Sequence, residues 1–196
     1  LAGSKIMSGF RFGRSLAVLA GGAALAAASP ALAKAGPPDI IVIVLDDVGF
    51  SDIGAFGSEI RTPNIDALAA RGLRYNRFDT KAVCSPTRAA LLTGRNPQTV
   101  RMADLPAMRL NRDDQTRDRG ELAPNAQTIA QVLRGGGYST HGFGKWHLAP
   151  EQEDGTTGNN GSWPLQRGFD SFYGFFLGWT DQYHPDLIEG NRRIPT

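Results

Sequence analysis

The sequence predicts an α/β fold in which helices cover both faces of a mostly parallel β-sheet. Residues 39–45 form a continuous run of β-branched and other apolar residues, which is typical of a strand buried on both faces. Predicted strands and helices alternate along the rest of the chain, as they do in α/β layer folds. Polar residues follow two of the predicted strands at their carboxyl ends, where open α/β sheets bind their ligands.

The composition is that of a folded protein with a nearly neutral body. The 196 residues carry a formal net charge of +2, and 41% of them are hydrophobic, which is enough for a core. Residues 1–33 contain three basic residues and no acidic one, so the remaining chain has a net charge of −1. This balance argues against a protein that binds nucleic acid.

The first 33 residues predict a signal peptide. Basic residues precede an Ala-rich apolar run at 15–28, and small residues suited to cleavage follow at 31–33. A transmembrane helix needs about 20 apolar residues, and this run is shorter, although an uncleaved N-terminal anchor is the alternative. We therefore expect an exported protein, periplasmic or secreted, with no membrane attachment after cleavage.

Proline and glycine residues mark the ends of the next predicted element. Thr62 and Pro63 predict the start of a helix that ends at Gly72. The apolar face of this helix is expected to contain Ile65, Leu68 and Ala69. Residues 73–78 alternate between apolar and polar side chains, which predicts a strand.

A second helix is predicted at 86–93, closed by Gly94. Cys84, the only cysteine, comes just before it, at a helix N-terminus where backbone N–H groups converge and negative charge is favoured. Arg88 follows four residues later and can lie on the same side of the helix.

The remaining chain predicts one more helix and one more strand. The helix spans 128–134, and the strand spans 138–144. The polar segments 103–124 and 151–161 are predicted surface loops.

Three pairs of functional side chains follow predicted strands or open a helix: Asp46 with Asp47, Cys84 with Arg88, and Lys145 with His147. In a parallel sheet all three pairs can meet at one edge. Adjacent carboxylates suit Ca²⁺ or Mg²⁺. A cation and two basic side chains can hold a tetrahedral oxyanion such as sulfate or phosphate, and a histidine can move a proton.

Each of these residues alone also has a purely structural explanation. An Asp pair after a strand often caps a turn, and a lone lysine, arginine or histidine often serves only a surface or structural contact. A single cysteine is often buried and inert. The joint pattern favours a functional site.

The segment C-S-P-T-R at 84–88, continued as A-A-L-L-T-G-R to residue 95, resembles the sulfatase signature C-x-P-x-R with its T-G-R ending. Further similar segments lie at 40–54, 62–69, 144–148 and 168–175. The resemblance spans about residues 39–178 and implies an alkaline-phosphatase-like fold. It implies that residues 34–196 are the N-terminal part of the catalytic domain.

The resemblance also implies the nucleophile and the metal. Cys84 would be oxidised to formylglycine by a formylglycine-generating or sulfatase-maturating enzyme. Ca²⁺, with Mg²⁺ as the alternative, would be bound by Asp46, Asp47 and the modified residue 84.

The other roles implied by the resemblance belong to basic side chains. Arg88 would steady the aldehyde hydrate, Lys145 would contact the sulfate ester, and His147 would bond the second hydroxyl. His184 could line the substrate pocket, with a turn before Pro185 as the equally good alternative.

The implied activity is hydrolysis of a sulfate ester, carried by a small molecule or a sulfated glycan. Alternatives are a phosphonate monoester or phosphodiester hydrolase of the same superfamily and a non-catalytic module that binds sulfated ligands. The family pattern continues with a later Asp-Asn or Asp-Gln pair, a histidine and a second lysine that have no counterpart up to Thr196. We therefore expect the chain alone to be an inactive or weakly active fragment.

Overall fold

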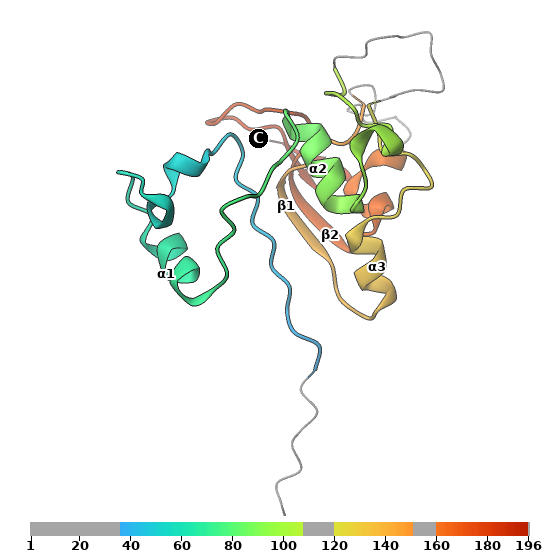
Figure 1. Ribbon diagram of the computed structural model, residues 1–196. Coiled ribbons are helices and arrows are strands. Elements are labelled where there is room, and N and C mark those ends of the chain that lie inside the picture. Colours follow the sequence, from blue (N-terminus) through green and yellow to red (C-terminus); the bar gives the residue numbers. More distant parts are fainter. Residues whose placement is uncertain (1–35, 108–119, 151–159, 196) are drawn as a thin grey trace, which may run out of the picture. The chain divides into compact units, whose positions relative to one another are not determined.

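The computed structural model describes residues 36–107, 120–150 and 160–195 (Figure 1). The predicted signal peptide at 1–33 lies outside the described residues. The chain divides into two units, residues 1–44 and 45–196. Within the described residues, no helix combines the length and the apolar character that a membrane crossing requires.

The first unit contains most of the segment 39–45 that was predicted to be a buried strand, and this prediction is wrong for the structure described. No residue of the segment is assigned to a strand, and its side chains are exposed; Ile41 is 83% exposed. A β-branched run favours an extended backbone, but a strand forms only when neighbouring backbone groups pair with it.

The second unit carries the helices and strands. Among the described residues, its helices of more than one turn are α1 (Pro63–Arg71), α2 (Cys84–Thr93) and α3 (Ile129–Gly135). Single 3₁₀ turns lie at Phe50–Asp52, Gly54–Phe56, Pro97–Val100, Asn160–Ser162 and Pro164–Arg167. The strands are β1 (His141–Lys145), β2 (Ser171–Phe175), β3 (Leu187–Glu189) and β4 (Arg192–Ile194).

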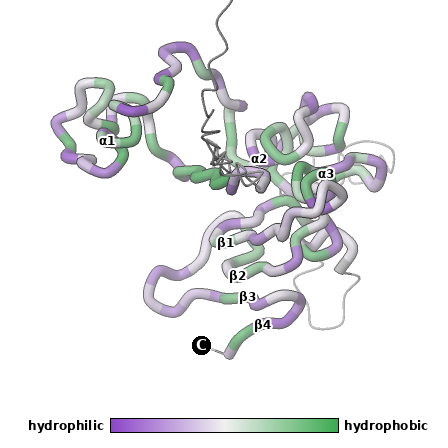
Figure 2. Tube along the Cα trace, turned by 90° about the horizontal axis from the view of Figure 1, so that it is seen from below, coloured by the Kyte–Doolittle hydropathy of each residue, from purple (hydrophilic) through white to green (hydrophobic). Residues whose placement is uncertain are grey.

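The described strands form one mixed sheet in the order β1-β2-β3-β4, and Figure 2 shows them side by side in that order. β1 and β2 run parallel, with Lys145 opposite Phe175, whereas β2–β3 and β3–β4 are antiparallel. The predicted α/β class is confirmed. The strand predicted at 73–78 is wrong: these residues are exposed and none of them belongs to a strand, and Leu73 is 88% exposed.

The helices begin and end close to their predicted positions because their signals are local. α1 starts at Pro63 and is followed by Gly72, as predicted. α2 starts at Cys84, two residues before the predicted start, because a proline fits the first turn, where its missing N–H has no helical acceptor. α2 ends where Gly94 adopts a left-handed φ of 65° and donates its N–H to the carbonyl of Ala90.

The core of the second unit lies between α2, the end of β1 and the segments around residues 122 and 163. Met102, Leu122 and Leu148 are fully buried in it. The predicted surface loop 103–124 is therefore wrong at its C-terminal end, where Leu122 and Ala123 are core residues; residues 108–119 lie outside the described residues. Of the second predicted loop, residues 151–159 lie outside the described residues.

Candidate active site

The backbone at the end of β1 and just after it is held in an unusual conformation. Gly144 has a φ of 87°, and His147, which is not a glycine, has a φ of 54°. The N–H groups of Trp146 and His147 donate to the carbonyls of Phe175 and Phe176, both at 3.0 Å, and so continue the parallel pairing beyond the strand. A non-glycine residue in this region costs about 1–3 kcal/mol, and such residues concentrate at functional sites.

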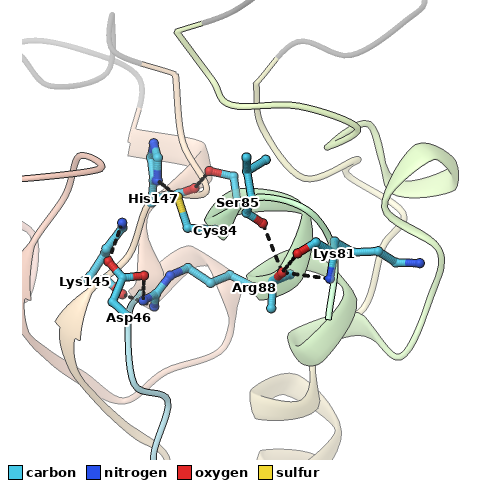
Figure 3. A network of polar contacts seen from close by, with 9 residues as sticks. Asp46, Lys81, Cys84, Ser85, Arg88, Lys145 and His147 are labelled. Carbon is cyan, nitrogen blue, oxygen red and sulfur yellow. Dashed lines mark hydrogen bonds and ion pairs between the residues drawn. The ribbon is translucent and has the colours of Figure 1, made fainter. Parts of the chain in front are cut away.

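The start of α2 is fastened to this backbone. Cys84 is the first residue of α2, and its Sγ lies 3.1 Å from Nδ1 of His147. The buried hydroxyl of Ser85 donates to the carbonyl of His147 at 2.8 Å. These two contacts fix the end of β1 against the helix N-terminus (Figure 3).

One carboxylate joins the two basic side chains of the site. Asp46 accepts from Nζ of Lys145 through Oδ2 at 2.7 Å and from Arg88 through Oδ1 at 3.3 Å. Arg88 also donates to the carbonyl of Lys145 at 2.8 Å. The Lys145 and Arg88 side chains are largely buried, whereas that of Asp46 is 40% exposed, so both cations converge on a carboxylate at the protein surface.

The electrostatic surroundings keep His147 neutral. Burial is the largest influence and, together with the positive charges of Lys145 and Arg88, lowers the pKa of His147 to about 4. Desolvation raises the pKa of Asp46, but the hydrogen bonds and charges of Lys145 and Arg88 outweigh it and hold that pKa below its ordinary value. At neutral pH the imidazole therefore has one N–H donor and one acceptor nitrogen.

The sequence model of the sulfatase family matches residues 38–194. The chain belongs to the sulfatase family. It is similar to human arylsulfatase A, with 41% identity over 153 residues that cover 76% of this chain and 27% of the relative. The chain thus spans about a quarter of this relative's length.

Two solved structures confirm the sulfatase fold. The crystal structure of Ps i-CgsB has a TM-score of 0.59 and 28% identity, covering 79% of this chain and 36% of that one. The structure of BT4656 in complex with its substrate D-glucosamine-2-N,6-O-disulfate has a TM-score of 0.56 and 27% identity, covering 76% and 26%. The described sheet is therefore a part of the alkaline-phosphatase-like sulfatase fold.

The structure brings together five of the sulfatase site residues predicted from the sequence: Asp46, Cys84, Arg88, Lys145 and His147. Asp47 comes directly after Asp46 in the sequence, and its backbone has a φ of 56°. Its carboxylate makes no hydrogen bond or ion pair with the described residues. Nowhere in 36–107, 120–150 and 160–195 do three or more metal-ligating side chains form a cluster.

His184 is not brought into this group. It is exposed, and its backbone N–H donates to Oδ1 of Asp181 at 2.7 Å. Its side chain makes no hydrogen bond with the site residues in the described part of the sulfatase chain. The structure supports the turn alternative, because Asp181 also accepts from the N–H of Tyr183 at 2.7 Å.

Two residues beside the site were missed by sequence reasoning. Ser85 occupies the variable position of the C-x-P signature, so the motif gave no reason to single it out. Gly178 lies against the ring of His147, and one glycine among 24 carries no signal of such a contact.

Proposed function

We propose that this chain is the nucleophile-bearing part of an enzyme that hydrolyses sulfate esters, with formylglycine at position 84 and bound Ca²⁺, or Mg²⁺ as the alternative. The observation that carries this proposal is the convergence of Cys84 and His147 beside two cations that share Asp46. Its substrate would be a sulfate-ester small molecule or a sulfated glycan. The protein would be exported after removal of residues 1–33.

The unmodified site contains a donor that lacks an acceptor. Nε of Arg88 is buried and has no hydrogen-bond partner in the described structure. Buried donors are almost always paired, so this one is suited to an acceptor that the described structure does not contain. A formylglycine hydrate would supply one hydroxyl to attack sulfur and a second whose deprotonation expels sulfate.

The carboxylates fit a hard cation, although they are only part of a complete ligand set. Asp46 and Asp47 present oxygen ligands on consecutive residues, and the Asp47 carboxylate has no partner among the described residues. A bound divalent cation would neutralise sulfate oxygens during the reaction. The modified residue 84 would be a third ligand of the cation, beside Asp46 and Asp47.

His147 and Lys145 supply complementary chemistry. With a pKa lowered to about 4, His147 is a neutral base whose Nδ1 faces residue 84 and can take up a proton there. Lys145 keeps a largely buried ammonium group next to it, which suits a negatively charged sulfate oxygen. Arg88 adds a second cation on the same carboxylate.

The test is expression of the complete reading frame with a sulfatase-maturating or formylglycine-generating enzyme. Mass spectrometry of the tryptic peptide 82–88 should show sulfur replaced by oxygen and the loss of two hydrogens. The product should hydrolyse an aryl sulfate faster than an aryl phosphonate, and a Cys84→Ala variant made in the same way should be inactive. A preference for the phosphonate would support the related phosphonate hydrolase, and an unmodified thiol would support a non-catalytic binding module.

A further inference from the structure

Gly178 leaves space that the ring of His147 fills. A Cβ built on Gly178 would lie 2.5 Å from Cε1, 2.7 Å from Nε2 and 3.1 Å from Nδ1 of His147. Real Cβ atoms essentially never come within 3.0 Å of such atoms. Any side chain at position 178 would therefore compete with the imidazole for the same place.

The backbone does not require this glycine. The described residues with positive φ include Gly144 and Gly168, and Gly178 is not among them. Gly144 is the opposite case, since its φ is 87° and a Cβ there would meet nothing within 4 Å. Position 178 thus needs glycine for the room it gives to a neighbouring side chain rather than for a turn.

The backbone of His147 is held in place by two hydrogen bonds, so it cannot easily move away from a side chain at position 178. Its N–H donates to the carbonyl of Phe176 at 3.0 Å, and its carbonyl accepts from Ser85 at 2.8 Å. The residue is only 9% exposed. A displaced ring would have to turn about its side-chain torsions, which would take Nδ1 away from Sγ of Cys84.

We propose that Gly178 is a positioning residue that keeps the imidazole of His147 against residue 84. The segment after β2 contacts His147 in two ways. Phe176 accepts a hydrogen bond from the backbone N–H of His147, and Gly178 leaves the space that the imidazole ring occupies. The catalytic consequence rests on the proposed sulfatase function, whereas the packing consequence does not.

The first measurement is the steady-state kinetics of Gly178→Ala in the matured protein from the complete reading frame. To relieve the clash, Cε1 must retreat from 2.5 Å to at least 3.0 Å. A misplacement of about 1 Å can lower kcat by about a hundredfold, so a retreat of about half that distance should lower kcat by about tenfold or more, with KM changed by less than about threefold. The matched control is Gly135→Ala at the end of α3, where a Cβ would meet nothing within 4 Å and kcat should stay as in the wild type.

A double-mutant cycle separates positioning from a general structural effect. In a His147→Ala background there is no ring to displace, so Gly178→Ala should cause no further loss of activity. An equal loss in both backgrounds would overturn the proposal, as would wild-type kcat in the single variant. If Gly178→Ala fails to fold, the double variant should recover folding, and its failure to do so would also overturn the proposal.

The packing itself can be tested without activity, in protein produced without the maturating enzyme. A crystal structure of Gly178→Ala should show the 3.1 Å contact between Nδ1 of His147 and Sγ of Cys84 broken, and Gly135→Ala should keep it. An intact contact in Gly178→Ala would overturn the inference. An inactive wild type with a broken contact in the variant would instead count against the proposed sulfatase function alone.

Discussion

Replacing His147 with glutamine should remove a large part of the acid sensitivity of the folded protein. The fold lowers the pKa of His147 from 6.5 to about 4, through burial first and then the charges of Lys145 and Arg88. As the pH falls below 6.5, the unfolded chain takes up a proton on this residue while the folded chain does not. Stability is therefore fully present above the unfolded pKa and is lost as the pH falls through the folded pKa.

The size of this loss follows from the two pKa values. Between about pH 7 and pH 5 the difference in proton binding lowers the free energy of unfolding by about 2 kcal/mol through this residue. His147→Gln keeps a polar, neutral side chain and removes the titration. Other acid-sensitive groups, including Asp46, are common to both proteins and cancel in the comparison.

The assay is urea unfolding of the unmatured, EDTA-treated protein at both pH values. The wild type should lose about 2 kcal/mol more than His147→Gln on going from pH 7 to pH 5. Equal losses in the two proteins would refute the reasoning, because they would mean that His147 has the same pKa in the folded and unfolded states.

Three further predictions concern the neighbours of this histidine. Asp46→Asn should lower the free energy of unfolding by about 1–2 kcal/mol at low salt and by less at high salt, since its ion pairs are partly exposed; urea unfolding at two salt concentrations measures this. Ser85→Ala should lower the free energy of unfolding by about 1–3 kcal/mol, because it leaves the His147 carbonyl unpaired. The control Thr99→Ala removes an exposed hydroxyl and should lower it by less than about 0.5 kcal/mol in the same assay. Ca²⁺ at about a hundred times its Kd should raise the free energy of unfolding of the matured protein by about 2.7 kcal/mol. The same Ca²⁺ concentration should not change the stability of Asp47→Asn, and a thermal-shift titration measures both.

The helices could be predicted because their boundaries depend on neighbouring residues. Pro63 and Gly72 enclose α1, Gly94 closes α2, and Thr128 caps α3 with a reciprocal bond to Gln131. Each of these signals acts within a few residues, so no knowledge of the tertiary structure is needed.

The strands depend on partners that are far away in the sequence. The runs 39–45 and 73–78 have the residue types of strands, yet neither is paired within the described structure. Conversely, β3 and β4 are three residues each, too short for a pattern, and they exist because β2 offers an edge to β3 and β3 pairs with β4. Side-chain alternation specifies an extended backbone but not which edge it will meet.

The candidate site could be located from the sequence, but its contacts could not. A motif at a helix start and a basic pair after a strand indicated Cys84, Lys145 and His147. That one carboxylate would be shared by two cations depends on side-chain directions that spacing does not specify. The same holds for Ser85, whose hydroxyl reaches a carbonyl 62 residues away.

Under the proposed function, the charges of the site imply that cation and anion binding would support each other. Asp46 and Asp47 carry two negative charges, Lys145 and Arg88 carry two positive charges, and His147 is neutral, so the group is balanced before any ligand binds. A divalent cation bound alone would give the partly buried site a charge of +2. A sulfate group bound alone would give the site a net negative charge that no cation balances. Each proposed ligand would remove the electrostatic cost of the other, and by linkage the gain in affinity would be the same in both directions. If the proposed metal took over the carboxylate of Asp46, the two basic side chains that hold it in this structure would be free to bind the sulfate group.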